Sequence, residues 1–415
     1  MYGCQQVLIH PNKDIKAILE YLCSESNKVY NCATYYARQI WFKTKKIVTR
    51  AEICSEMVRN SHFSAMYVSS SQQTCNAVAE AFKSFKELLN AFNKGELTFK
   101  PAAPKYRKSG GLYTVSFPKR WLKLTLQGIR IPLGRQVKAW FGIDSFYLPM
   151  PSNLNFSDIK EIRILPRNRC LYTEFVYSVD MPIQGLDKSQ ALGIDHGVNN
   201  WLTCVDTRGN SFIVDGKHLK SVNQWYNKQV STIKEDKPQG FWSKKLATIT
   251  EKRNRQMRDA INKVARLVIN HCLKHSIGSI VFGWNQGNKQ EINLGRKNNQ
   301  KIVQIPTARL KERVSQLCEQ YGIRFIETEE ANTPTASFLD DDSLPKHGEK
   351  PVGWKSSGKR VKRGLFRTAQ NQYINADANG AANIIKKVAT TLGICLKEVG
   401  RGALITPLRI RFWIS

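Results

Sequence analysis

The chain has 415 residues, of which 41% are hydrophobic, and its 64 Lys and Arg outweigh 33 Asp and Glu to give a formal net charge of +31 at pH 7. A chain of this length can bury several cores, so we expect several domains. The cations are spread along the whole sequence, which favours an extended surface for a polyanion. The sequence has no run of about 18 apolar residues and no signal pattern, so we expect no membrane partner and a cytoplasmic protein.

A short apolar strand is predicted at residues 6–10, and a helical bundle follows from about residue 13 to 93. The segment predicted as a helical bundle has almost no Gly or Pro, and its apolar and aromatic residues recur at spacings of three and four. Most of these aromatics are expected to pack between helices. The alternative, stacking on nucleobases, stays open for the few that protrude, chiefly around Tyr35, Tyr36 and Trp41.

Prolines and glycines at residues 100–111 end the helical region, and four basic residues surround one tyrosine there. A loop that grips phosphate would have this composition. Its candidate contacts are Lys105, Tyr106, Arg107 and Lys108. From residue 112 to about 181, short β-rich runs alternate with Pro, Gly and Asn turns, which predicts a small antiparallel barrel that the strand near Val7 could join.

The third region opens at residues 191–205, which are predicted as strand, turn and strand with Asp195 at the end of the first strand. A basic stretch at residues 222–275 is predicted as helices. A charged helix face is usually only solvated, but the excess of one sign makes phosphate contact at least as reasonable here. Its candidate contacts are Lys252, Arg253, Arg255 and Arg258.

Two more strands are predicted at residues 279–283 and 322–328, with a helix at 307–321 between them. Two acids, Glu329 and Glu330, follow the last of these strands. Strands that alternate with helices and carry acids at their ends predict an α/β domain whose site lies at the carboxyl edge of its sheet.

Asp377 lies near the start of a small-residue helix that we predict to continue to Val388. Hydrolysis of a phosphodiester requires an attacking water to lose a proton while the leaving oxygen gains charge, and two Mg²⁺ ions about 4 Å apart can serve both needs. Mg²⁺ prefers carboxylate oxygens. Asp195, Asp377 and one of Glu329 and Glu330 could hold such ions. Each acid alone could be a turn or helix-start residue, but their coincidence favours a magnesium site that faces nucleic acid.

Five segments of the chain carry a family resemblance. Residues 193–200 (GIDHGVNN) and 374–380 (INADANG), with segments 302–310, 333–340 and 363–366, resemble the transposon-encoded TnpB proteins, the compact RNA-guided nucleases related to type V CRISPR effectors. The resemblance covers almost the whole chain. It implies a multidomain α+β protein with a helical recognition bundle, a small antiparallel β-barrel called the wedge, and an RNase H-like (RuvC) α/β nuclease domain.

The resemblance also implies domain boundaries, partners and catalytic residues. The first catalytic acid would be Asp195 and the last Asp377. The partners would be a guide RNA made from the element's own end and double-stranded target DNA with a short flanking motif. The implied domains are the first wedge strand at 1–12, the helical recognition domain at 13–99, the wedge barrel at 100–185, the RuvC-like nuclease at 186–332, an insert in place of a zinc ribbon at 333–370, the last nuclease segment at 371–400 and a C-terminal tail at 401–415.

The middle catalytic acid is where this sequence departs from the family. Relatives commonly carry a glutamate at the end of the strand equivalent to residues 279–282, and Gly283 stands there in this chain. Adjacent strand ends lie about 5 Å apart, so Glu330, or with less support Glu329, could reach the same site. Glu291, in a polar loop, is a third candidate. The alternative is that the two neighbouring glutamates are a solvated acid pair and the site is dead.

The second departure concerns zinc. Relatives hold a ribbon with cysteine pairs before the last nuclease segment, whereas residues 333–372 contain no cysteine, which excludes a tetrahedral sulfur site there. The ten cysteines of the chain form no Cys-x-x-Cys pair, which favours reduced, buried thiols. The acidic run at 340–342 is interpreted as a solvated loop in preference to a metal site. Further candidate nucleic-acid contacts are Lys359, Arg360, Lys362 and Arg363.

Three functional hypotheses remain open. The leading one is an RNA-guided, Mg²⁺-dependent endonuclease that is encoded by a transposon and cuts double-stranded DNA, which the two aspartate motifs favour. The second is an RNA-guided DNA-binding protein with an inactive nuclease, motivated by Gly283 and the missing ribbon. The third is an unguided transposase or structure-specific nuclease. The sequence leaves both a monomer and a dimer possible.

Overall fold

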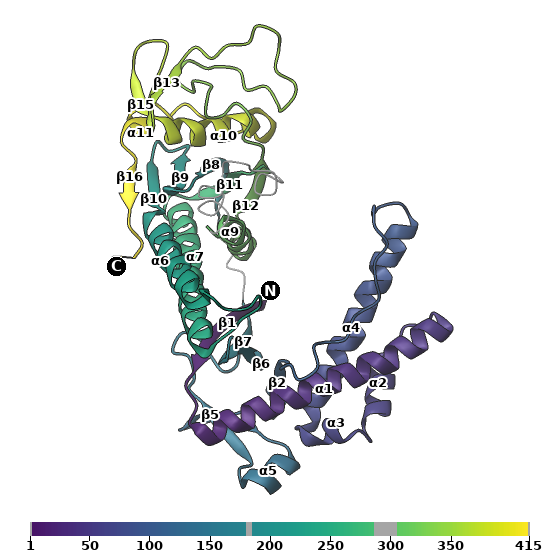
Figure 1. The fold of residues 1–415 in the computed structure, drawn as a ribbon. Coiled ribbons are helices and arrows are strands. Elements are labelled where there is room, and N and C mark those ends of the chain that lie inside the picture. Colours follow the sequence, from purple (N-terminus) through teal and green to yellow (C-terminus); the bar gives the residue numbers. More distant parts are fainter. Residues whose placement is uncertain (1, 180–184, 286–304, 414–415) are drawn as a thin grey trace. The chain divides into compact units, whose positions relative to one another are not determined.

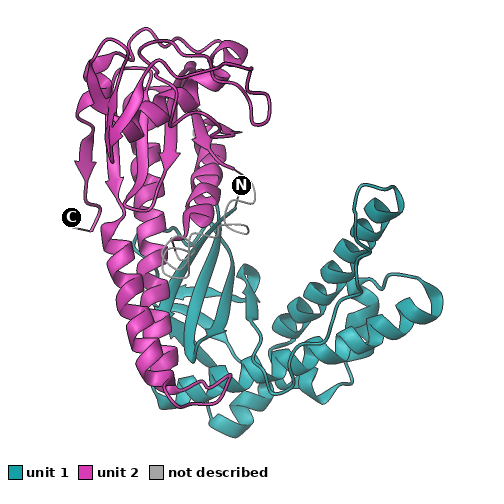
Figure 2. Ribbon diagram, turned by 45° about the horizontal axis from the view of Figure 1, so that its top comes forward, with its two compact units in different colours: residues 1–180 teal, residues 181–415 magenta. Residues whose placement is uncertain are grey.

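The computed structural model describes residues 2–179, 185–285 and 305–413 (Figure 1). The chain forms two compact units, Met1–Asp180 and Met181–Ser415 (Figure 2). Each unit contains both helices and sheets, which confirms the predicted multidomain α+β class. None of the helices in the described ranges is long and apolar enough to cross a bilayer.

The first unit begins with the predicted helical region. Its helices are α1 (Lys13–Thr44), α2 (Arg50–Met57), α3 (Ser61–Ala65) and α4 (Val68–Asn93). Polar side chains fix where they start: the Asn12 side chain accepts from the N–H of Ile15, and Thr49 and Glu52 form a capping box at α2. The apolar positions spaced by three and four residues are the buried ones, such as Ile18, Leu22 and Val29 of α1.

The strands of the first unit are antiparallel, as predicted, but they form two sheets. One has the order β1 (Tyr2–Ile9), β7 (Cys170–Ser178), β6 (Ile159–Arg167) and β2 (Val115–Pro118); the other contains β3 (Lys123–Thr125), β4 (Gly128–Pro132) and β5 (Ser145–Leu148). The N-terminal strand pairs with β7 along its whole length, as expected for the strand near Val7. The short elements η1 (Lys119–Trp121) and α5 (Arg135–Phe141) complete this unit.

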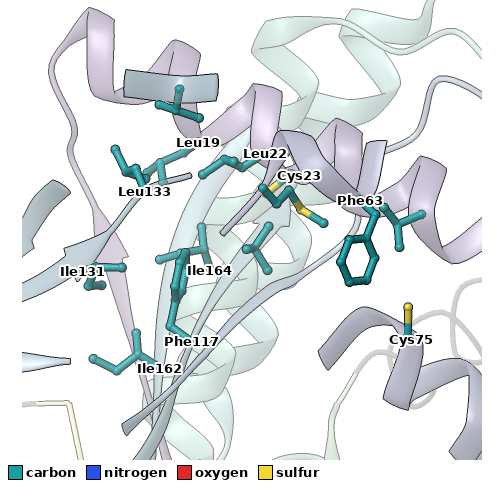
Figure 3. Packing of buried hydrophobic residues seen from close by; sticks show 14 of the residues in the cluster. Leu19, Leu22, Cys23, Phe63, Cys75, Phe117, Ile131, Leu133, Ile162 and Ile164 are labelled. Atoms are coloured by element: carbon teal, nitrogen blue, oxygen red, sulfur yellow. The ribbon is translucent and has the colours of Figure 1, made fainter. Parts of the chain in front are cut away.

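One apolar core joins the helices and both sheets of the first unit. Leu19 and Leu22 of α1 pack with Phe117 of β2, Ile131 of β4 and Ile164 of β6 (Figure 3). The helical and β-rich segments, which the sequence analysis treated as separate domains, therefore share their buried side chains, and neither segment has this core without the other.

The second unit is built on a six-stranded sheet. Its order is β12 (Arg324–Thr328), β11 (Ile277–Gly283), β8 (Asp187–His196), β9 (Asn200–Asp206), β10 (Ser211–Asp215) and β16 (Leu408–Ile410). β8, β11 and β12 run parallel, and β9 is antiparallel to β8 and β10. The expected C-terminal tail thus contributes β16, an edge strand parallel to β10.

Helices cover both faces of this sheet. They are α6 (Lys217–Lys234), α7 (Lys244–Lys274), α9 (Thr307–Tyr321), α10 (Ala376–Leu392) and α11 (Arg401–Ile405). Alternate residues of β8 face opposite sides: Leu192 and Ile194 share a core with α7 and α9, whereas Ala191 packs with α10 (Figure 1). A small three-stranded sheet, β13 (Lys359–Lys362), β14 (Leu365–Arg367) and β15 (Tyr373–Asn375), lies just before α10 in the chain.

Helix α10 crosses β8 at very close range. A Cβ atom added to Gly193 would lie 2.4 Å from the carbonyl oxygen of Ala381 and 2.4 Å from a side-chain carbon of Ile385. Only a residue without a side chain allows this approach. The glycine of the 193–200 motif therefore has a packing role, because it lets α10 lie directly on β8.

We predict that Gly193→Ala lowers the free energy of unfolding by about 1–3 kcal/mol, since the added methyl group meets backbone as well as side chain. The measurement is urea unfolding of the full chain. Gly402→Ala is the matched control, because nothing lies within 4 Å of the Cβ position there and the residue is helical. Equal stability of Gly193→Ala and the unmodified chain would contradict the close packing.

Candidate active site

Asp195 is the acid at the end of β8, on the face covered by α10. A Cβ on Gly380 would lie 3.0 Å from its Oδ2, so a second glycine of α10 leaves room for this carboxylate. Burial raises the pKa of Asp195 to about 8, with the negative charges of Glu330 and Asp377 adding to the effect. Charges act this way only at short range, so Glu330 and Asp377 both lie near enough to Asp195 to influence it.

Asp377 is held in the first turn of α10. The Asn375 side chain caps the helix by accepting from the N–H groups of Asp377 and the next residue. Oδ2 of Asp377 accepts from the Asn200 amide at 2.6 Å, and Oδ1 lies 3.4 Å from the Arg360 guanidinium. Arg409 of the C-terminal edge strand donates to Oδ1 of Asn200 at 3.1 Å, which orients that amide toward Asp377.

Glu330 occupies the space that Gly283 leaves. A Cβ on Gly283 would lie 2.9 Å from Oε1 of Glu330 and 2.5 Å from Cδ1 of Ile384, so a side chain at 283 and the present position of Glu330 exclude each other. Asn285 holds the glutamate on two sides: its Oδ1 accepts from the Glu330 N–H at 2.9 Å, and its amide donates to Oε2 at 3.3 Å.

His196 contacts both Gly283, at the end of β11, and Glu330, which follows β12. Its Nδ1 is 3.1 Å from the carbonyl oxygen of Gly283 and 2.9 Å from Oε1 of Glu330. A carbonyl oxygen can only accept, so Nδ1 is the donor, and its N–H lies between the Gly283 oxygen and the buried Oε1 of Glu330. Burial by itself lowers the pKa of His196, but contact with Glu330 and the charge of Asp195 outweigh it and raise this pKa.

Acids and cations meet in one cavity of about 310 Å³. Its charged and amide-bearing lining comes from Asp195, His196, Asn199, Asn200, Lys217, Arg360, Arg363 and Asp377. A water molecule has about 30 Å³ in the liquid, so the cavity has room for a hydrated cation beside a phosphate group. The carboxylates suit the cation, and the guanidinium and ammonium groups suit the phosphate.

The carboxylates are close but are not already gathered around one point. In the described ranges, no three His, Cys, Asp or Glu side chains form a ready metal cluster. Asp377 is held by its amide and guanidinium partners and Glu330 by Asn285. Of the alternative acids, Glu329 pairs with Lys387 and accepts from a backbone N–H, and Glu291 lies outside the described residues.

The predicted phosphate loop is only partly free to bind phosphate. The Arg107 guanidinium lies 4.3 Å from the centre of the Tyr113 ring and donates to an amide of α1, so it serves the packing of the loop. Tyr106 is half exposed, and Lys105 and Lys108 are exposed. All four candidates are exposed, but the Arg107 side chain is also held by contacts within the unit.

The four candidates on α7 divide in the same way. Arg253 donates to Asn223 at 2.9 Å and Arg258 pairs with the buried Glu251 at 3.1 Å, so both are used within the unit. Lys252 and Arg255 are exposed. Sequence periodicity could not separate these pairs, because the partners of Arg253 and Arg258 are set by packing.

The cations before α10 are the candidates nearest the acids. Arg360 and Arg363 line the active-site cavity, whereas Lys359 and Lys362 are exposed strand residues outside its lining. The sequence analysis did not single out Lys217, which lines the same cavity, or the site roles of His196 and Asn200. The signal for the last two was present, because both belong to the 193–200 motif that carries Asp195.

The acidic run at 340–342 lies in a loop, as interpreted, but two of its carboxylates also accept hydrogen bonds from the rest of the insert. Asp342 accepts from the N–H groups of Ser337 at 2.7 Å and Ser357 at 3.1 Å. Asp340 accepts from the Ser337 hydroxyl at 2.5 Å and the Ala369 N–H at 2.8 Å. Backbone N–H groups in turns need acceptors, and the two carboxylates supply them across the insert.

Comparisons with known proteins agree with this fold. Residues 174–288 match the family model OrfB_IS605, described as a probable transposase. No curated protein gives a significant match. The matched segment contains β8 to β11, and with them Asp195, His196 and Gly283.

Several solved structures are similar at low sequence identity. A cryo-EM structure of a Cas12f1–sgRNA–target DNA complex has a TM-score of 0.53 and 15% identity, with 90% of this chain and 83% of that chain covered. A CRISPR–Cas12f ternary complex gives a TM-score of 0.32 at 15% identity, with 90% and 82% covered. The mini-RNA-guided endonuclease CRISPR-Cas_phi3 gives 0.40 at 11% identity, with 93% and 92% covered. Residues 174–288 are therefore similar to this transposase family, and the chain shares a fold with the first of these structures.

Proposed function

We propose that this protein is a transposon-encoded, RNA-guided DNA endonuclease that depends on Mg²⁺. The observation that carries the proposal is that Asp195 and Asp377 line one cavity together with cations, while Glu330 lies near enough to help raise the pKa of Asp195. The match of residues 174–288 to a model described as a probable transposase supports the link to a transposon. The similarly folded Cas12f1 structure is a complex with an sgRNA and target DNA, which supports RNA and DNA as partners here.

The donor set fits a hard divalent cation. All three groups are carboxylates, and Oε1 of Glu330 is buried, with the Nδ1–H of His196 that it shares with Gly283 as its neighbouring donor. Asp195, Glu330 and Asp377 would hold Mg²⁺, which when bound supplies activation of the attacking water and neutralises charge on the leaving oxygen. Asn285 and His196 keep Glu330 beside this site.

The cations of the cavity would bind the scissile phosphate. Lys217 and Arg363 line the same cavity as the two aspartates. Arg360 is shared, because it lines the cavity and also pairs with Asp377 at 3.4 Å. The arginine guanidinium can donate to two phosphate oxygens at once. A cation that neutralised Asp377 would therefore free Arg360 to bind the substrate phosphate.

Asp195 carries a proton at neutral pH in the metal-free protein, since its pKa is raised to about 8. The unfolded chain releases that proton above about pH 4. The folded state therefore binds more protons between these two values, and its stability falls as the pH rises through this window. A negative charge at Asp195 is unfavourable for folding until a cation neutralises it.

We predict that Asp195→Asn makes the metal-free protein more stable at pH 8, by at least about 1 kcal/mol, because the amide cannot ionise. Near pH 4 the two proteins should be nearly equal. The measurement is urea unfolding in EDTA at both pH values. The same variant should have no cleavage activity. Parallel pH dependence of the two proteins would contradict the assignment of this charge to Asp195.

We predict that Glu330→Gln lowers Mg²⁺-dependent DNA cleavage by more than about 100-fold, because even groups one contact removed from a metal are worth about 10- to 100-fold. Glu329→Gln is the control, since this neighbour pairs with Lys387 and should keep activity within a few fold. Cleavage of a guide-matched plasmid measures both. Full activity of Glu330→Gln would refute its role as the middle acid.

The proposed function is tested by expressing the protein with its flanking locus, sequencing the RNA that co-purifies, and offering matched plasmid DNA with Mg²⁺ or EDTA. We expect bound RNA and cutting that requires both the match and Mg²⁺. Bound RNA and DNA without cutting would support the alternative, an inactive RNA-guided DNA-binding protein. Cutting in the absence of RNA would indicate an unguided nuclease.

A further inference from the structure

The first unit contains a second cavity, of about 590 Å³, far along the sequence from the nuclease residues. It is lined by α1, by the end of α2 and by the loop that the sequence analysis connected with phosphate. The side chains that matter for its chemistry are Tyr35, Tyr36, Gln39, Glu56, Tyr106 and Arg107. Its volume lies within the range of about 300–1,000 Å³ that is common for small-ligand sites.

Two aromatic rings of this cavity are open to solvent. The side chain of Tyr35 is 58% exposed and that of Tyr106 is 48% exposed. Within the described residues, no aromatic or cationic group stacks on the Tyr35 ring, which stands on a surface turn of α1. Arg38 lies 5.3 Å from the centre of the Tyr106 ring. These rings offer flat apolar faces that the folded chain leaves uncovered.

The loop at residues 104–108, which forms the cavity wall opposite α1, is held in place by hydrogen bonds before any ligand binds. The Asn31 side chain makes two hydrogen bonds to the backbone of Arg107, at 2.8 Å and 3.1 Å. Asn27 donates to the carbonyl of Lys108 at 3.1 Å, and Arg38 donates to that of Pro104 at 2.7 Å. A loop held by four hydrogen bonds to one helix keeps Tyr106 in place, so a ligand meets a preformed site.

The polar groups of the cavity distinguish between ligands. Glu56 is exposed, and neither its side chain nor that of Gln39 has a hydrogen-bond partner among the described residues. A carboxylate repels phosphate, so the occupant of the cavity is not a phosphate group. A carboxylate accepts hydrogen bonds from the amino groups of bases, and an amide can both donate and accept.

We propose that this cavity binds one unpaired nucleobase of a single-stranded nucleic acid. The base stacks on Tyr35, and Gln39 and Glu56 contact its edge, which favours bases that carry an amino group over uracil and thymine. The exposed Lys105 and Lys108 lie beside the cavity wall and would contact the adjoining phosphates. The inference deepens the nucleic-acid part of the proposed function and rests on it, but it involves no cleavage.

The test uses the full-length protein freed of bound RNA, in EDTA, with fluorescein-labelled ten-nucleotide strands of A, C or U and of dA, dC or dT. We expect Tyr35→Ala to weaken binding of the A and C strands about 5- to 150-fold, the usual value of one base–aromatic stack. Tyr35→Phe should keep the affinity. Tyr2→Ala, which removes a 71% exposed tyrosine elsewhere in the unit, should also keep it.

The base preference and the source of the base are read from the same titrations. Glu56→Gln should reduce the preference for A and C over U, while general affinity stays the same or rises because a negative charge is lost. Tighter binding of the ribo series identifies RNA as the source, and tighter binding of the deoxy series identifies DNA. Binding that is unchanged in Tyr35→Ala overturns the proposal. Loss of all binding in the unmodified protein would instead contradict the proposed function.

Discussion

The candidate active site depends on the close contact between α10 and β8. Gly193 allows the backbone of α10 to lie on the strand, and Gly380 leaves room for the carboxylate of Asp195. The contact joins two segments that are far apart in the sequence, and it brings Asp377 to the strand end where Asp195 lies. Side chains at the two glycines would separate the helix from the strand and the two acids from each other.

The same helix limits where the middle acid can be. Ile384 of α10 and the Glu330 side chain together fill the space above Gly283, so the end of β11 cannot carry a side chain in the present arrangement. The neighbouring strand, β12, runs parallel to β11 and its chain continues to Glu330. A carboxylate offered from β12 reaches nearly the position that one on β11 would take, which makes the departure at Gly283 compatible with a working nuclease.

Much of this arrangement could be predicted from the sequence, because it rests on local patterns. The period of the helices, the strand ends and the small residues before Val388 located Asp195 and Asp377 without coordinates. The partners of charged side chains could not be predicted in this way. Arg107 and Arg253 proved to contact side chains within the first and second units respectively, and these partners come from distant parts of the chain.

Two other differences have the same origin. The acids at 340–342 bind backbone N–H groups of turns whose positions only the folded insert defines. The C-terminal residues form an edge strand, and Arg409 there orients the amide that contacts Asp377. Neither contact has a local signature, because each depends on the register of segments that meet only after folding.

The central claim is that Glu330 completes the set begun by Asp195 and Asp377. It is tested most directly by a crystal structure with Mn²⁺ in place of Mg²⁺, located from its anomalous signal. The account predicts manganese bound by oxygens of Asp195, Asp377 and Glu330, with the Arg360 guanidinium displaced from Asp377. Manganese bound by the two aspartates while Glu330 keeps its contacts with Asn285, or bound by Glu291, would contradict it.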